Sequence, residues 1–64
     1  MGPSFSAYLT ALKLREAERL LISTDASITE IASTLGFSTT SHFIARFKEA
    51  KHVTPAQFRK LVAK

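Results

Sequence analysis

Apolar residues recur three or four positions apart along most of the chain, and short polar runs divide them into four segments. This spacing places apolar side chains on one face of a helix, whereas a half-buried strand would alternate at every second position. Residues that cap helix N-termini precede the segments: Ser4, then Ser27 with Glu30 as its capping-box partner, and Thr54. The pattern predicts an all-α domain of about four helices, over about 5–23, 28–35, 40–51 and 55–63.

The first segment differs from the others because its apolar residues form two stripes on different faces. The first stripe consists of Phe5, Tyr8, Leu9 and Leu12. The second, rotated around the helix axis, consists of Leu14, Ala17, Leu20 and Leu21. A helix whose apolar face changes halfway along contacts two different bodies, and the rest of this chain supplies only one. We therefore expect the first stripe to be an interaction surface.

Residues 28–51 have the pattern of a helix-turn-helix, in which two helices are joined by a tight turn. Gly36 stands where the chain needs a positive φ to reverse direction. Ala32 is small enough for the two helices to cross closely, and Phe37 and Phe43 fill the wedge between them. An ordinary αα-hairpin can use the same residues, so this pattern alone leaves both interpretations open.

The last two helices are each expected to bury one face. The residues at buried spacing are Phe43, Phe47 and Ala50 in the first of them and Phe58, Leu61 and Val62 in the second. On the outer side of the helix over 40–51, the candidates for contact with DNA base edges are Thr40, Ser41, Ile44 and Ala45. Candidates for contact with phosphates are Thr39, Arg46, Lys48 and Lys51. The chain has no Asn, and its one Gln lies outside this helix, so we expect weak discrimination between base sequences.

Composition and charge narrow the class of protein. With 64 residues, 45% of them apolar, the chain has room for one small domain. The absence of cysteine excludes a disulfide framework and cysteine-dependent zinc sites. The net charge of +4 is uneven: residues 1–37 sum to −1 and residues 38–64 to +5. This asymmetry favours a polyanionic partner for the second half, although a basic solvated surface has the same composition.

Nothing in the sequence predicts catalysis, a metal site or a cofactor. The two imidazoles, His42 and His52, are ten residues apart and no pair of carboxylates accompanies them. The hydroxyl residues lack a His/Asp constellation and stand at capping positions. We therefore expect neither an enzyme nor a metalloprotein. Apolar runs are at most three residues long, so we also expect no membrane partner.

An ordered set of motifs covers almost the whole chain and resembles the C-terminal part of AraC/XylS-type DNA-binding domains. The motifs are Gly2, Ser4-Phe5, Tyr8-Leu9, Ala17, Leu20-Leu21, Ile28, Ile31-Ala32, Gly36-Phe37-Ser38, Ser41-His42-Phe43, Phe47-Lys48, Thr54-Pro55 and Phe58-Arg59. Members of that family are bacterial transcription regulators, and their DNA-binding domain holds two helix-turn-helix subdomains joined by a long helix. This chain looks like that linking helix followed by the second subdomain, a little over half of the family domain.

The resemblance implies sequence-directed binding of double-stranded DNA in the bacterial cytoplasm, with the helix over 40–51 in the major groove. It also implies that the first apolar stripe faces the missing first subdomain. Lys13 stands where the family commonly has Arg and joins the candidates for phosphate contact. The chain departs from the family where Ala45 replaces a basic residue and where Lys51-His52 replaces an aromatic followed by Gly. We expect it to be a fragment, cloned or natural.

A protein-interaction module is the alternative to a DNA-binding unit. The stripe of Phe5, Tyr8, Leu9 and Leu12 has no partner within the sequence and suits a second copy of the chain, RNA polymerase or an intact regulator.

Overall fold

The computed structural model describes residues 5–62, with side chains from Ala7 onward. It contains four helices in that range, α1 (Phe5–Ser23), α2 (Ile28–Thr34), α3 (Thr40–Lys51) and α4 (Pro55–Val62). The predicted all-α class is confirmed. The expected cap at Ser4 and the side chain of Phe5 lie outside the described residues.

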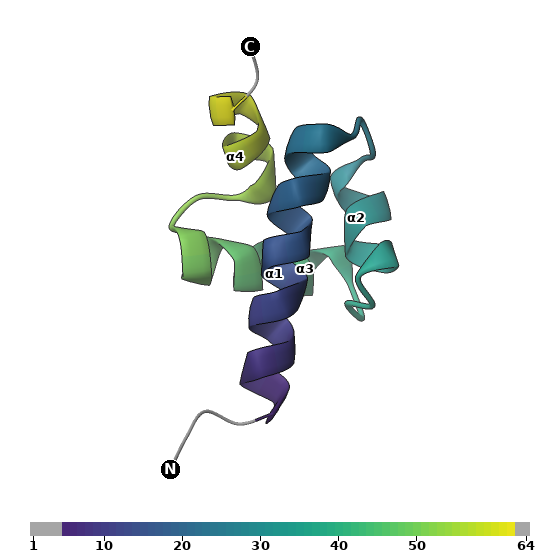
Figure 1. Ribbon diagram of the computed structural model, residues 1–64, viewed down its shortest axis with the longest axis vertical. Coiled ribbons are helices and arrows are strands. Elements are labelled where there is room, and N and C mark those ends of the chain that lie inside the picture. The colour runs from purple at the N-terminus through teal and green to yellow at the C-terminus, as the bar shows by residue number, and fades with distance from the viewer. Residues whose placement is uncertain (1–4, 63–64) are drawn as a thin grey trace.

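Helix α1 is the axis of the fold, and the other three helices pack around its C-terminal part. In Figure 1, α1 runs along the long dimension, α3 crosses it, and α2 and α4 lie on either side. Helix α1 contacts each of the other three helices. Its N-terminal half extends beyond them, so the two halves of α1 have different surroundings.

The core is built from the second stripe of α1 and the inner faces of α2 and α3. The buried apolar residues are Leu14, Ala17, Leu21, Ile31, Ala32, Phe43 and Phe47. Aromatic rings continue through this core from the α2–α3 turn to α4: the centroid distances are 5.1 Å for Phe37–Phe43, 5.9 Å for Phe43–Phe47 and 5.5 Å for Phe47–Phe58. These four aromatic rings therefore connect the α2–α3 turn, α3 and α4 through the core.

Three residues expected in the core are exposed. Leu61 and Val62 are 73% and 37% exposed, because α4 is short and contacts the core through Pro55 and Phe58. Ala50 is exposed although it lies on the core-facing side of α3. The segment of α1 opposite Ala50 carries small residues, including Ala11, and an open cleft separates the two helices there. The expected inner faces of α3 and α4 were thus wrong at these three positions.

Side-chain caps fix the starts of the three later helices. The predicted capping box of α2 is confirmed, with Glu30 N–H donating to Ser27 Oγ (3.0 Å) and Ser27 N–H to Glu30 Oε1 (3.1 Å). Thr39 caps α3 by accepting a hydrogen bond from the backbone N–H of the third residue of that helix. At α4, Gln57 N–H donates to Thr54 Oγ1 (3.1 Å) and Thr54 N–H to Gln57 Oε1 (2.9 Å). Each reciprocal box satisfies backbone donors that a helix N-terminus otherwise leaves free.

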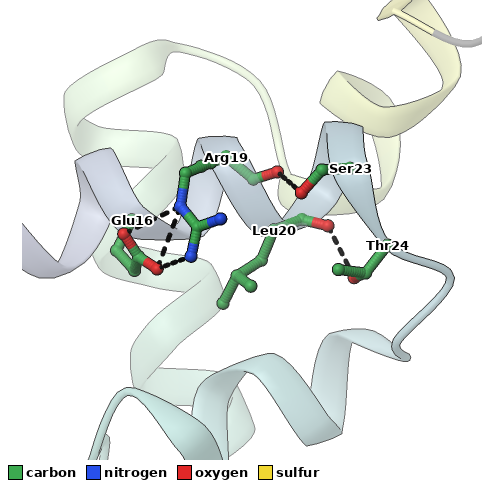
Figure 2. A network of polar contacts seen from close by, with 5 residues as sticks. All are labelled: Glu16, Arg19, Leu20, Ser23 and Thr24. Atoms are coloured by element: carbon green, nitrogen blue, oxygen red, sulfur yellow. Dashed lines mark hydrogen bonds and ion pairs between the residues drawn. The ribbon is translucent and has the colours of Figure 1, made fainter.

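The C-terminal end of α1 carries a network of local polar contacts. Figure 2 shows Ser23 Oγ donating to the Arg19 carbonyl (2.6 Å) and Thr24 Oγ1 donating to the Leu20 carbonyl (2.7 Å). It also shows Arg19 hydrogen-bonded to both carboxylate oxygens of Glu16. These hydrogen bonds lower the pKa of Glu16 and raise the pKa of Arg19. Because both side chains are open to solvent, water and salt screen the pair, and it adds little to stability.

Arg59 joins α4 to the same end of α1 by long-range hydrogen bonds. Its guanidinium donates to the carbonyls of Leu21 (3.2 Å), Thr24 (3.1 Å) and Ala26 (2.6 Å). These carbonyls belong to the last turn of α1 and the connection to α2, where helical partners are lacking. Arg59 therefore attaches α4 to the end of α1, together with the buried Pro55 and with Phe58, which packs against the core.

Replacing Arg59 by Gln is expected to lower the free energy of unfolding by about 2 kcal/mol, because hydrogen bonds from a charged donor to partly buried carbonyls are lost. The control is Lys60→Gln, which makes the same change of charge at an exposed neighbouring position. Urea unfolding followed by circular dichroism measures both. Equal effects of the two substitutions would show that Arg59 does not anchor α4.

Two of the residues between 5 and 62 have positive φ, and substitutions at them are expected to have opposite effects on stability. Gly36 has φ 83°, and a Cβ there would meet only Lys13 Nζ at 3.8 Å, an ordinary contact. Gly36→Ala should therefore lower the free energy of unfolding by about 1 kcal/mol, because of backbone strain at positive φ and not because of a steric clash. His52 caps α3 with φ 68°, so His52→Gly should stabilise by about 1 kcal/mol. The same urea titration tests both; stabilisation by Gly36→Ala would contradict the assignment.

Candidate nucleic-acid interface

The turn between α2 and α3 fixes how α3 projects from the domain. Gly36 N–H donates to the Ser33 carbonyl and Phe37 N–H to the Ala32 carbonyl, both at 3.0 Å. These hydrogen bonds cap the C-terminus of α2 at the point where the chain reverses direction. The ring of Phe37 then packs on Phe43 at the start of α3. The predicted wedge is confirmed, and it holds α3 with its outer face free.

The outer face of α3 consists of five exposed residues: Ser41, His42, Ala45, Lys48 and Glu49. Of the four residues predicted to face bases, Ser41 and Ala45 belong to this face. The other two, Thr40 and Ile44, are half-buried at its edges. The face offers a hydroxyl, an imidazole, a methyl group and one cation.

His42 and Glu49 were not among the predicted site residues, although both share this face. The His42 ring stacks edge-on against Phe37 with centroids 5.5 Å apart, so the imidazole is held over the turn. Glu49 adds a negative charge near the C-terminal end of the face. Helical spacing from Ser41 and Ala45 could have found both residues.

The residues predicted to contact phosphates have unequal surroundings. Lys48 is exposed and forms no ion pair within the described part of the chain. Arg46 Nη1 contacts Glu49 Oε1 at 3.3 Å, and Lys51 Nζ contacts Glu18 Oε1 of α1 at 2.6 Å. Lys48 is therefore the cation of α3 that an external anion reaches without displacing a carboxylate.

The remaining two predicted phosphate contacts lie at the N-terminal end of α3. Thr39 is exposed, and its hydroxyl oxygen accepts a hydrogen bond from His42 N–H at 3.0 Å. Lys13 reaches from α1 so that Nζ lies 5.3 Å from the centroid of the Phe37 ring. This is a cation–π distance, so Lys13 supports the turn as well as carrying charge.

The first stripe of α1 is exposed on the N-terminal half of the helix. Tyr8 is 57% exposed, Leu9 38% and Leu12 42%. Ile22, at the other end of α1, is 60% exposed and was not predicted as a surface residue. The exposed stripe therefore stands apart from the core that α1 shares with α2 and α3.

Other kinds of site have no basis in the described residues. Within residues 5–62, no three His, Asp or Glu side chains come together in a way that could hold a metal ion. None of the helices described is both long and apolar enough to cross a membrane. The surface features that remain are the outer face of α3, the cations around it and the stripe on α1.

Comparison with known proteins agrees with this geometry. The profile of a family described as a helix-turn-helix domain matches residues 1–61. The melibiose operon regulatory protein of Escherichia coli K12 is 41% identical over 61 residues, and the HTH-type transcriptional regulator MtrA of Neisseria gonorrhoeae is 37% identical over 60. These alignments cover 95% and 94% of this chain but 20% of each relative.

A solved structure shows the same arrangement of helices. The C-terminal domain of the two-component response regulator yesN from Fusobacterium nucleatum superposes with a TM-score of 0.86 at 36% identity. The match covers 92% of this chain and 57% of that chain. The relatives named here are regulators rather than enzymes. The chain belongs to the AraC-type helix-turn-helix family of bacterial transcription regulators.

Proposed function

We propose that this chain binds double-stranded DNA as part of a bacterial transcription regulator in the cytoplasm, with α3 in a major groove. The observation that carries the proposal is the exposed outer face of α3, which is polar, includes the unpaired cation Lys48, and is held outward by the Phe37–Phe43 wedge. A major groove is about 12 Å wide and admits one α-helix. The family supports the same use of this helix.

The residues of α3 divide into two roles under this proposal. Ser41 and Ala45 face base edges, where a hydroxyl donates or accepts and a methyl contacts thymine, while Thr40 and Ile44 border the same groove. Lys48 contacts phosphate directly. Thr39, Lys13, Arg46 and Lys51 assist at the two ends of α3. The phosphate contacts supply most of the affinity and little of the specificity.

The chain alone is expected to bind weakly. It spans about a fifth of the length of the relatives it matches. Under the proposal, α1 is a linking helix and the helices after it form the second of two helix-turn-helix units. One such unit with few base-reading side chains should bind largely non-specifically, with a Kd of about 10⁻⁴–10⁻⁶ M at physiological salt. Sequence-directed binding then requires the other unit.

The proposal predicts that Lys48→Ala weakens binding to a short duplex and lowers the slope of log K against log salt by about 0.9, because one fewer counterion is released. Fluorescence anisotropy across several salt concentrations measures both quantities. Lys60→Ala, on α4, serves as the charge-matched control and should leave the slope nearly unchanged. Equal affinities and equal salt slopes for the two variants would show that α3 does not contact DNA.

A second function is favoured by the exposed stripe on α1. Tyr8, Leu9 and Leu12 form an unpartnered apolar face of the kind that marks a protein interface. The first helix-turn-helix unit of an intact regulator, a second copy of the chain or RNA polymerase would each cover it. Because this stripe and the outer face of α3 lie on different helices, both functions can coexist.

If the stripe mediates self-association, the double substitution Tyr8→Asp and Leu12→Asp should make the chain monomeric, since two charges would have to be buried. Sedimentation equilibrium at several concentrations reports the oligomeric state, and duplex affinity measured in parallel should stay within about twofold of the wild type. A wild-type chain that is monomeric throughout would leave the stripe to a different protein partner.

A further inference from the structure

A cleft lies between α1 and the C-terminal half of α3, and of its lining residues the proposed function uses only Arg46 and Lys51. Its volume is about 410 Å³. The floor is made by small and apolar side chains of the two helices, among them Ala11, Leu14 and Ala50. Larger residues at Ala11 and Ala50 would bring the helices into contact, so the cleft follows directly from this sequence.

Three cations from two helices line this cleft. Arg15 comes from α1, and Arg46 and Lys51 come from α3. Glu49 is the one acidic residue in the lining, and Glu18 reaches Lys51 from α1. Arg15 has no ion pair among those found in residues 5–62, so the cleft keeps an excess of positive charge.

One nitrogen of the Arg46 guanidinium lacks a hydrogen-bond acceptor. Its Nη1 contacts Glu49 at 3.3 Å, but its Nε is buried and has no hydrogen-bond partner among the described residues. A buried charged donor without an acceptor is unfavourable, and an anion entering the cleft would relieve it. The two carboxylates already present do not reach this atom.

We propose that Arg15, Arg46 and Lys51 form a phosphate-binding cleft for the DNA backbone, in which Glu18 and Glu49 hold two of the cations until a phosphodiester displaces them. This rests on the proposed function, and it adds Arg15 of α1 to the interface. Arginine suits the role because its planar donors match two phosphate oxygens at once.

The position of the cleft explains why a phosphodiester is the occupant. Arg46 and Lys51 belong to the helix proposed to enter the major groove, and both are half-buried at the borders of its exposed outer face. The backbone strands border a major groove on both sides, so a helix in the groove has phosphates at its flanks. The Glu18–Lys51 and Glu49–Arg46 pairs are partly solvent-exposed, so an incoming phosphate can replace them at small cost.

The test compares charge-matched variants in duplex binding measured by fluorescence anisotropy. Arg15→Gln should weaken binding about tenfold, the effect of losing one charge-assisted hydrogen bond, and should lower the salt slope by about 0.9. Lys60→Gln removes the same charge from α4 and should change affinity less than about twofold. Thermal unfolding of each variant confirms that both remain folded.

Removing a carboxylate from the cleft gives an independent test, in which duplex affinity should rise instead of fall. Glu18→Gln frees Lys51 and should strengthen duplex binding about threefold. Asp25→Asn makes the same change of charge in the α1–α2 connection, where no ion pair is found, and should have little effect. A gain from Glu18→Gln that exceeds the gain from Asp25→Asn separates local competition from a general change in net charge.

The outcomes distinguish this proposal from the function on which it rests. If Lys48→Ala weakens binding while Arg15→Gln behaves like Lys60→Gln, then α3 binds DNA and the cleft is not a phosphate site. If the wild-type chain binds no duplex at low salt, the proposed function itself fails. If Arg15→Gln leaves DNA affinity intact but changes self-association, the cleft serves a protein carboxylate instead.

Discussion

The packing of Phe43 and Phe47 against the second stripe of α1 is the contact on which every other part of this domain depends. Both rings are fully buried, and they lie on the one helix that carries the candidate interface. Their inward position turns Ser41, Ala45 and Lys48 outward, because residues half a turn apart on a helix point in opposite directions. The same rings connect to Phe37 in the turn and Phe58 in α4. The packing of the hydrophobic core therefore also sets the orientation of the candidate interface, so a change in one changes the other.

The charges around α3 show a balance between attraction to a polyanion and neutralisation within the domain. The second half of the sequence has a net charge of +5, yet Arg46 and Lys51 are each engaged by a carboxylate in the free protein. Such pairing limits non-specific attraction at long range, while the cations stay available at contact distance. Under the proposed function, affinity for DNA would depend on the exchange of carboxylate partners for phosphates as well as on the number of basic residues.

Periodicity and capping residues were enough to predict the helices and most of the core, because both act locally along the chain. Ser27–Glu30 is read from adjacent sequence, and Leu14, Ala17 and Leu21 share one helical face. The exposure of Ala50, Leu61 and Val62 could not be predicted this way, since it depends on the size of residues on other helices and on the short contact of α4. Within the site, Ser41 and Ala45 follow from the helical wheel of α3. The Arg46–Glu49 pair is also local, because the two residues are three positions apart on α3. The partners of Lys51 and Lys13, Glu18 and the Phe37 ring, depend instead on how α1 packs against α3 and the α2–α3 turn, which no single segment encodes.

The contacts of Arg59 fix the backbone path of another segment without requiring particular side chains in that segment. Its three acceptors are backbone carbonyls at residues 21, 24 and 26, so the hydrogen bonds depend on the path of the chain between α1 and α2 and not on the identity of Asp25 within it. Any sequence that follows the same path presents the same acceptors. The connection between α1 and α2 can consequently accept substitutions of its side chains, by natural variation or by design. Helix α4 stays attached as long as the backbone keeps its path.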